Sequence, residues 1–417
     1  MKKFTLVFIL TGLLVFMTNR SDAQNTHSYL YKVGMVDSVH SDILKETRKI
    51  YVQLPDDYYK QPNRTYPVAY ILDGEVLLPA VSNALTFYSG GYVPEMVLIG
   101  ISDHIHRTRD LTPTVIKTKY GMPFNGPSGG AGQFIQFLQK ELIPYVDKTY
   151  RVTGYRTLIG HSYGGLFTIY TLLTNSDLFA NYLAIDPSLD WDHQIILRQA
   201  KRKILEQKFT EKSLFISLNG QLDMQNPDIT IHNVMEDTTD YTLFARSNIS
   251  FRNFLRQHSN NGLFFRWKFY PEEIHGTIAY PSIRDGLVSL FKWFQMENTS
   301  LFNSPDTPKE LLYKTIKQRE SKLRHHFGYT VPPYPEDLLN MLGYMNLRWQ
   351  HPEKSKMFFK LEIAYYPKSA GAYGSMADFY ESQHDTTNTL KYLEKAYRLN
   401  SSASIRDKIN ALKSDIK

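Results

Sequence analysis

The segment Gly160-His161-Ser162-Tyr163-Gly164 is the feature that most restricts how this chain can fold. It follows residues 156–160, which are typical of a buried strand, and it leads into residues 163–174, where apolar residues recur at helical spacing. A G-x-S-x-G sequence between a strand and a helix is typical of a nucleophile elbow, a strained turn that flanking glycines make possible. We therefore expect an α/β fold in which Ser162 is a catalytic nucleophile.

A histidine must accept the proton of such a serine, and in folds of this kind it follows the last strand. Predicted strand 263–270 runs into Pro271-Glu-Glu-Ile-His275-Gly276, and predicted helix 281–296 follows. Of the 13 histidines, only His275 combines a late strand before it with a glycine and a closing helix after it. His275 is therefore the predicted base, whereas His161 is expected to pack beside the elbow.

The acid that orients the histidine should lie between the serine and the histidine in the chain. That order points to the loop after predicted strand 213–219, and Asp223 in this loop is the predicted acid. Asp186 at the end of the preceding strand, and Glu236 and Asp240 further along the loop, are also possible acids.

Two backbone amides are candidates for the oxyanion hole. Tyr163 directly follows the nucleophile at the start of a helix, where its N–H faces developing negative charge. A second donor normally follows an early strand, and here strand 66–72 leads to Gly74 and Glu75, either of which could supply it. A plain β-turn at Gly74 is the alternative.

An alternation of strand-like and helix-like segments from Arg48 to about Met296 predicts a mostly parallel central sheet. The predicted strands are 48–54, 66–72, 96–101, 156–160, 181–186, 213–219 and 263–270, with an antiparallel strand near 29–39 before them. The predicted helices are 131–147, 163–174, 239–258 and 281–296.

The polar, proline-punctuated stretch 298–308 predicts a linker between residues 24–297 and a helical domain at 309–417. Segments 336–369 and 370–403 align at a period of about 34 residues and resemble two degenerate tetratricopeptide repeats, which could bind a protein partner. A generic helical hairpin domain is the alternative. The expected architecture is an α/β domain followed by a small all-α helical-repeat domain.

Residues 1–23 have the layout of a secretory signal: Lys2 and Lys3, an apolar run from Phe4 to Met17, and a polar stretch ending at Ala23. The apolar run is shorter than the roughly 20 residues that span a bilayer, so we expect cleavage after Ala23, no membrane span afterwards and a periplasmic or secreted product. The chain has no cysteine, which excludes disulfides and a lipid-modified cysteine.

Other chemistries are disfavoured. The net charge of +7 comes from scattered lysines and arginines without a basic stripe, so nucleic-acid binding is not expected. The glycine-rich segment 128–133 lacks the residues of a phosphate-binding loop and is expected to begin a helix. His104 and His106 lack an evident third ligand, so we expect no metal and no cofactor.

Several motifs together resemble the esterase family that includes enterochelin esterases, feruloyl esterases and esterase D, over residues 30 to 297. They are Tyr70-Ile-Leu-Asp-Gly74, Arg107-Thr-Arg-Asp-Leu-Thr-Pro113, Gly129-Gly-Ala through Glu141-Leu-Ile-Pro-Tyr145, Gly160 to Phe167, Asp186-Pro-Ser-Leu189 and His275-Gly276. The resemblance implies an α/β-hydrolase fold, a triad on Ser162, His275 and Asp223, and no cofactor. It is nearest to the periplasmic siderophore esterases, although a single Trp191, a candidate for substrate binding, stands where that branch often has two tryptophans.

We therefore expect an exported serine ester hydrolase that acts on a small-molecule or glycan-linked ester. A siderophore ester is the first candidate, and a feruloyl or acetyl ester of plant polysaccharide is the second. A protein of a different class, in which the helical repeats bind a partner and the hydrolase domain is a relic, is the competing hypothesis.

Overall fold

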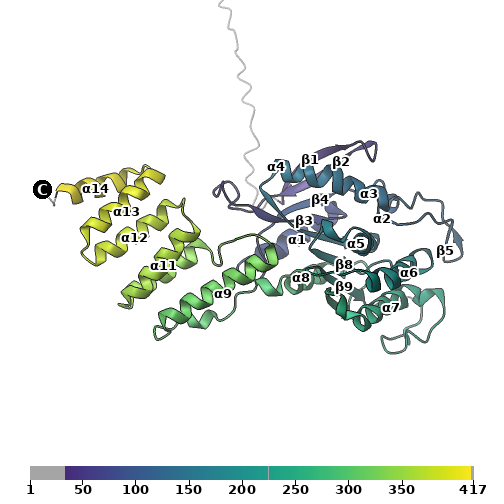
Figure 1. Cartoon of the computed structure of the whole chain (residues 1–417). Helices are drawn as coiled ribbons and strands as arrows, with labels where there is room; N and C mark the ends of the chain where they lie inside the picture. Colours follow the sequence, from purple (N-terminus) through teal and green to yellow (C-terminus); the bar gives the residue numbers. More distant parts are fainter. Residues whose placement is uncertain (1–32, 224, 415–417) are drawn as a thin grey trace, which may run out of the picture. The chain divides into compact units, whose positions relative to one another are not determined.

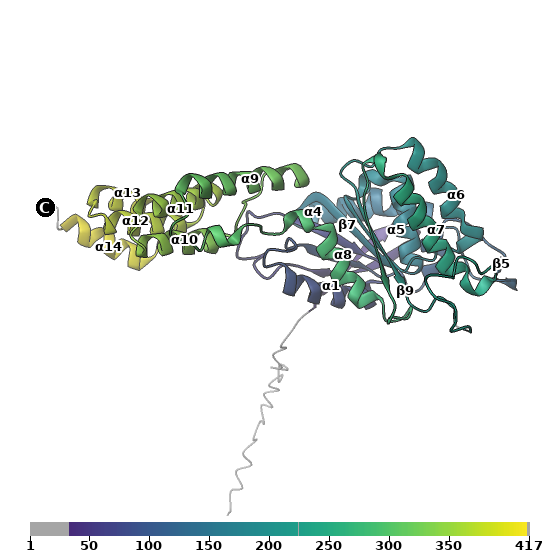
Figure 2. The same cartoon turned by 90° about the horizontal axis from the view of Figure 1, so that it is seen from below.

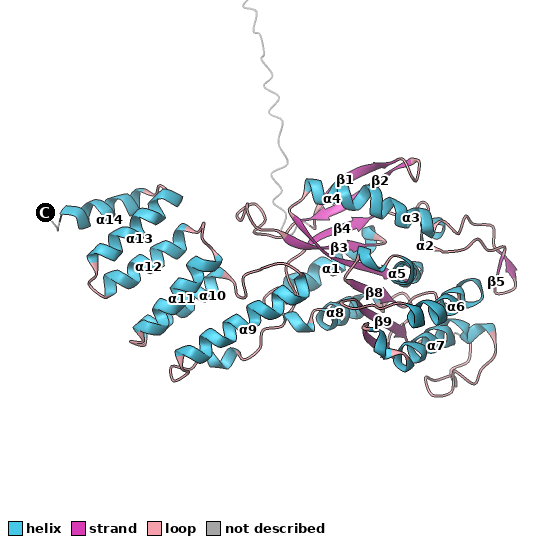
Figure 3. Cartoon of the chain, viewed as in Figure 1, coloured by secondary structure: helices cyan, strands magenta, loops and turns pink. Residues whose placement is uncertain are grey.

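The computed structural model describes residues 33–223 and 225–414, and its centre is one eight-stranded sheet (Figures 1 and 3). The strand order is β1-β2-β4-β3-β7-β8-β9-β10. Strands β1 and β2 pair antiparallel with each other, and β2 pairs antiparallel with β4, while the strands from β4 to β10 are parallel. The strands are β1 (Met35–Ser41), β2 (Glu46–Gln53), β3 (Tyr66–Ile71), β4 (Val97–Ile101), β7 (Val152–His161), β8 (Asn181–Ile185), β9 (Ser213–Asn219) and β10 (Phe264–Tyr270).

The residue pattern of each strand explains its place in the sheet. The segments of β3, β4 and β8 are buried along their whole length, as expected for parallel strands covered by helices on both faces. Strand β1 alternates between exposed and buried residues near its end, which suits an edge of the sheet. All seven predicted strands and the antiparallel first strand are confirmed, with bounds that shift by a few residues.

Helices cover both faces of the sheet (Figure 2). Helices α1 and α8 pack against each other on one face, and α5, α6 and α7 pack in sequence on the other. The helices of this part are α1 (Gly74–Tyr88), α2 (Arg107–Leu111), α3 (Ala131–Phe137), α4 (Ile143–Thr149), α5 (Tyr163–Thr174), α6 (Trp191–Glu206), α7 (Leu243–Gln257) and α8 (Ala279–Leu290). A π-helical turn over Leu138–Leu142 joins α3 to α4, and a small hairpin is made by β5 (Thr118–Lys119) and β6 (Met122–Pro123).

The sequence did not predict helices α1 and α6. Helix α1 begins at Gly74, where the sequence also allowed a plain turn, and α6 follows Asp190. Helix α1 contains Pro79, and the second to fourth residues of α6, Asp192 to Gln194, have positive φ. Pro79 weakens the sequence signal of α1, because proline disfavours a helix interior. The positive φ values in α6 are visible only in the structure.

The C-terminal part is entirely helical within the residues described, as predicted. Its helices are α9 (Lys309–Phe327), α10 (Glu336–Arg348), α11 (Pro352–Tyr365), α12 (Ala370–Ser382), α13 (Thr386–Leu399) and α14 (Ala403–Ser414). Helices α12 and α13 begin 34 residues after α10 and α11 respectively, which matches the predicted period. The assignment of these pairs as tetratricopeptide repeats stays a prediction.

The segment 298–308 contacts the C-terminal helices. Phe302 is buried and packs with Tyr334 and Phe358 in the hydrophobic core of the C-terminal helices. The division into residues 24–297, a linker at 298–308 and a helical domain at 309–417 stays a prediction. The predicted signal segment, residues 1–23, lies outside the described residues.

Candidate active site

Ser162 lies in the sharp turn between β7 and α5, as predicted. Its backbone has φ 60° and ψ −114°, a strained conformation for a residue with a side chain. The glycines around it are required by space: a Cβ on Gly160 would lie 2.3 Å from the carbonyl oxygen of Gly164, and a Cβ on Gly165 would lie 2.9 Å from that of Ile185. The turn is tied to the next strand, because the Ser162 N–H donates to the Ile185 carbonyl at 3.0 Å.

The structure brings His275 to Ser162, although the two are 113 residues apart in the chain. The distance from His275 Nε2 to Ser162 Oγ is 3.0 Å. His275 lies in the loop between β10 and α8, and its ring contacts the edge of Phe244 at the start of α7, with 5.4 Å between ring centroids. A neutral imidazole in this position can take the hydroxyl proton as a general base.

The acid at the histidine is Asp186, and the prediction of Asp223 is wrong. Asp186 Oδ2 lies 2.6 Å from His275 Nδ1, and Asp186 is fully buried. Asp223 instead accepts hydrogen bonds from the backbone N–H groups of Gln225 and Asn226, at 2.7 and 3.1 Å, within its own loop.

Strand order explains why Asp186 reaches the site. Strand β8 is the direct neighbour of β7 in the sheet, so Asp186 at its end lies beside the elbow, whereas β9 lies one strand further away. Asn219 at the end of β9 then holds the carboxylate, with its backbone N–H at 3.0 Å and its side-chain amide at 2.6 Å. The sequence made Asp186 a possible acid but carried no signal of strand adjacency. Within the described part of the chain, Glu236 and Asp240 make no hydrogen bond to His275, whose two ring nitrogens face Asp186 and Ser162.

His161 lies beside His275 and is largely buried. Its ring centroid is 4.6 Å from that of His275. Burial, and secondarily the nearby His275, lower the pKa of His161 to about 4. His161 therefore stays neutral at neutral pH and adds no positive charge beside His275, which fits the packing role expected for it.

The two predicted oxyanion donors lie at the same edge of the sheet. Tyr163 is the first residue of α5 and Gly74 is the first residue of α1, and N–H groups in a first helical turn have no acceptor within their own helix. The loop before Gly74 borders the elbow, since a Cβ on Gly164 would lie 3.5 Å from Asp73 Oδ2. Glu75 uses its side chain elsewhere, accepting from the Ser102 hydroxyl and lying 3.0 Å from His104 Nδ1.

Trp191 does not face solvent, which corrects its prediction as a substrate-binding residue. It is 1% exposed, and its indole N–H donates to Thr114 Oγ1 at 3.1 Å. Its ring meets Tyr163 at a centroid distance of 5.4 Å and Phe124 at 5.6 Å. Trp191 thus packs against Tyr163 from the protein interior.

Lys119 was not predicted from the sequence. It lies on the β5–β6 hairpin and donates to the Tyr163 hydroxyl at 3.2 Å, with Asp190 Oδ2 at 3.6 Å. Its ammonium also lies 5.1 Å from the centre of the Tyr163 ring. A cation is therefore held next to the residue that follows the nucleophile, but nothing in the sequence distinguishes Lys119 from other lysines.

His161, Asp186 and His275 are the single group in the described residues whose side chains could jointly hold a metal ion. The 2.6 Å contact between His275 and Asp186 is a hydrogen-bond distance that leaves no space for an ion between them. His104 and His106 approach different carboxylates, those of Glu75 and Glu46. The geometry therefore favours proton transfer at this group.

Comparisons with known proteins agree with this geometry. Residues 41–235 match the family model "Putative esterase". The chain is therefore similar to esterases of this family over this part of its sequence. The family match, the relatives and the structural neighbour together support a carboxylic ester hydrolase with an α/β-hydrolase fold.

The esterase is similar to proteins with related names. It is 26% identical to "Ferri-bacillibactin esterase BesA" of Bacillus subtilis, over 50% of this chain and 77% of the relative. It is 27% identical to "Siderophore enterobactin esterase" of Emericella nidulans, over 53% of this chain and 80% of the relative. The structure of an IroE-like serine hydrolase from Shewanella oneidensis matches with a TM-score of 0.64 and 29% identity, covering 79% of this chain and 98% of that one.

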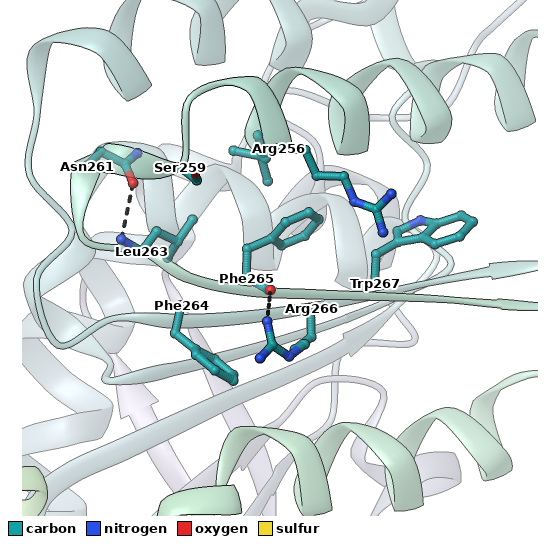
Figure 4. A pocket seen from close by; sticks show the side chains of 9 residues that line it. Arg256, Ser259, Asn261, Leu263, Phe264, Phe265, Arg266 and Trp267 are labelled. Carbon is teal, nitrogen blue, oxygen red and sulfur yellow. Dashed lines mark hydrogen bonds between the residues drawn. The ribbon is translucent and has the colours of Figure 1, made fainter.

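A pocket of the esterase lies apart from Ser162, His275 and Asp186 (Figure 4). It is formed by the end of α7 and by β10, the last strand of the sheet, and is lined by Leu255, Arg256, Ser259, Asn261, Leu263, Phe264, Phe265, Arg266 and Trp267. It shares no residue with the Ser162, His275 and Asp186 group.

In the two described ranges, no helix has the length and apolar character needed to cross a membrane.

Proposed function

We propose that this esterase is a serine hydrolase that cleaves ester bonds of siderophores with the triad Ser162, His275 and Asp186. The observation that carries the proposal is the continuous chain of contacts from Ser162 Oγ to His275 Nε2 at 3.0 Å and from His275 Nδ1 to Asp186 at 2.6 Å. The siderophore substrate is supported by the names of the relatives, which act on ferri-bacillibactin and enterobactin.

The reaction follows from the roles of these groups. Ser162 Oγ attacks the ester carbonyl carbon while His275 Nε2 takes its proton, and buried Asp186 stabilises the imidazolium that forms. The amides of Tyr163 and Gly74 donate to the oxyanion of the tetrahedral intermediate. His275 then returns the proton to the leaving alkoxide, the alcohol departs, and water cleaves the acyl-enzyme by the same steps in reverse.

The test uses the purified chain with enterobactin, bacillibactin and triacetylfusarinine C, each iron-free and iron-loaded, and with feruloylated arabino-oligosaccharide. Products are followed by liquid chromatography and mass spectrometry, and Ser162→Ala is the control. We expect ring-opened siderophore products from the wild type and none from the variant. Release of ferulate without siderophore cleavage would instead support the polysaccharide esterase, and cleavage by the variant would remove Ser162 from the mechanism.

We also propose that the enzyme acts after export, because residues 1–23 have the layout of a signal peptide. Cell fractionation with N-terminal sequencing tests this step. We expect a mature protein that begins at Gln24 outside the cytoplasm; a protein that retains Met1 and stays with the cytoplasmic fraction would contradict it.

A further inference from the structure

Arg107, in the short helix α2, joins the two turns that carry the proposed oxyanion donors. Its Nε and Nη2 donate to the two oxygens of Asp73, at 2.5 and 2.9 Å. Its Nη2 also donates to the carbonyl oxygen of His161 at 3.1 Å, and its guanidinium lies 5.5 Å from the centre of the Tyr163 ring. One side chain thus holds the residue before Gly74 and the residue before Ser162.

Both turns are strained and need such support. Asp73 has φ 50° and Ser162 has φ 60°, and residues with a side chain adopt such values only when their surroundings hold them there. A rotation of the backbone at Asp73 would turn the N–H of Gly74. An oxyanion donor displaced by about an ångström loses much of its effect, since the hydrogen bond must be set before charge develops.

Asp103 is the third member of this network. It is 1% exposed, and its Oδ2 accepts the backbone N–H of Asp73 at 3.2 Å. Its Oδ1 has no partner among the described residues. Burial, followed by the charge of the nearby Asp73, raises the pKa of Asp103 well above its usual range.

The charges of Arg107, Asp73 and Asp103 balance if Asp103 is protonated. The two acids Asp73 and Asp103 share one arginine, Arg107, and all three side chains are mostly or fully buried. Two buried carboxylates beside a single guanidinium would leave one negative charge uncompensated, which is costly. A neutral Asp103 removes this excess charge and leaves Arg107 paired with Asp73 through two contacts.

We propose that Arg107, Asp73 and Asp103 form a positioning unit that fixes the Gly74 and Tyr163 amides for the oxyanion. The inference rests on the proposed serine esterase activity and adds residues that do not touch the reacting atoms. Because the unit acts on the transition state, its loss should lower kcat far more than it raises KM.

The first experiment compares the variants Arg107→Gln and Arg107→Lys with Arg109→Gln, using p-nitrophenyl butyrate. Arg109 lies in the same helix and pairs with Asp110 and Glu46, so it is a matched control that does not reach the elbow. We expect Arg107→Gln to lower kcat about 100-fold, as for the loss of one oxyanion donor, with KM changed less than about threefold. Arg107→Lys, which cannot make the paired contacts, should recover only part of kcat, and Arg109→Gln should keep it.

The second experiment separates the two acids. Asp103→Asn keeps a neutral donor and acceptor of the same shape, so kcat should stay within about threefold of the wild type. Asp73→Asn removes the charge that pairs with Arg107. It should lower kcat about 100-fold, the same loss that is expected for Arg107→Gln. Inhibition by a boronic acid, which forms a tetrahedral adduct on the serine, should weaken in parallel with kcat.

Each result is normalised to folded protein by thermal unfolding and far-ultraviolet circular dichroism. Unchanged kcat in folded Arg107→Gln, or a larger loss in Asp103→Asn than in Asp73→Asn, would overturn the inference. A wild type that hydrolyses neither p-nitrophenyl butyrate nor the siderophores would refute the proposed function instead. The same variants would then show only their effect on unfolding temperature, which marks a structural role for the network.

Discussion

At the residue scale, the assignment of the triad acid gives the sharpest prediction. Asp186→Asn keeps the shape of the side chain but cannot stabilise the imidazolium or fix the tautomer of His275. We expect kcat on p-nitrophenyl butyrate to fall about 10⁴-fold, as for this change in other serine triads. Asp223→Asn is the matched control and should keep kcat within about twofold, because Asp223 bonds only within its own loop. The reverse result would restore Asp223 as the acid.

The sequence placed Ser162 and His275 but not Asp186, for a physical reason. The first two lie in local patterns, a glycine-flanked turn and a loop between the last strand and a helix. The acid is fixed by which strand lies next to β7, and this neighbour relation depends on pairing between segments that are far apart in the chain. Asp186 and Asp223 both follow buried strands and are equivalent in sequence.

At the scale of elements, the nucleophile elbow predicts different tolerance of its glycines. Gly160→Ala would place a Cβ 2.3 Å from a carbonyl oxygen, whereas a Cβ on Gly164 would make ordinary contacts at 3.5 Å. We expect Gly160→Ala to destabilise the protein by about 1–3 kcal/mol and to displace Ser162, while Gly164→Ala changes the free energy of unfolding by less than about 1 kcal/mol. Urea unfolding measures the free energy of unfolding of each variant, and labelling with a fluorophosphonate measures the reactivity of Ser162. Equal losses of stability in the two variants would show that the turn accommodates the Cβ by a backbone shift at another residue.

Helices α1 and α6 show the limit of prediction at this scale. The sequence of α1 contains Pro79, which points away from a helix, and the first turn of α6 is distorted by positive φ values. Packing compensates for this weak helical preference, because Leu77, Leu78 and Val81 of α1 are buried. Packing against a formed sheet outweighs weak local propensity.

At the scale of the whole molecule, the C-terminal helices contain an acid that makes their stability depend on pH. Glu362 of α11 is 1% exposed, receives a hydrogen bond from Asn340 at 3.1 Å, and has one oxygen without a partner among the described residues. Burial, and then the charges of Glu336 and Asp337, raise the pKa of Glu362 to about 7. The position that aligns with Glu362 one 34-residue period later is Ala396, so the second helical pair has no acid there.

The sign of the pH effect follows from this raised pKa. The folded protein keeps the proton of Glu362 up to about pH 7, whereas the unfolded chain releases it near the usual pKa of glutamate, so the free energy of unfolding falls as pH rises between these values. We expect Glu362→Gln to stabilise the protein at pH 8 by about 1–3 kcal/mol and to have little effect at pH 4.5. Thermal unfolding at both pH values checks this.

The control for this prediction is Glu353→Gln in the same helix. Glu353 has an exposed side chain, with an ion pair of 3.7 Å to Lys309, so its replacement should shift the unfolding temperature little at either pH. If both variants respond alike at pH 8, the burial of Glu362 is not the cause.

By itself, the sequence determined the α/β architecture and the residues proposed as nucleophile and base, because alternating hydrophobicity, a glycine-flanked turn and a late loop histidine are local features. The tertiary structure alone decided the rest. It chose Asp186 over Asp223, buried Trp191 against Tyr163, and joined Arg107, Asp73 and Asp103 beside the elbow. Each of these outcomes depends on strand order and on burial between distant segments, and these determine which carboxyl groups meet the histidine and which must stay neutral.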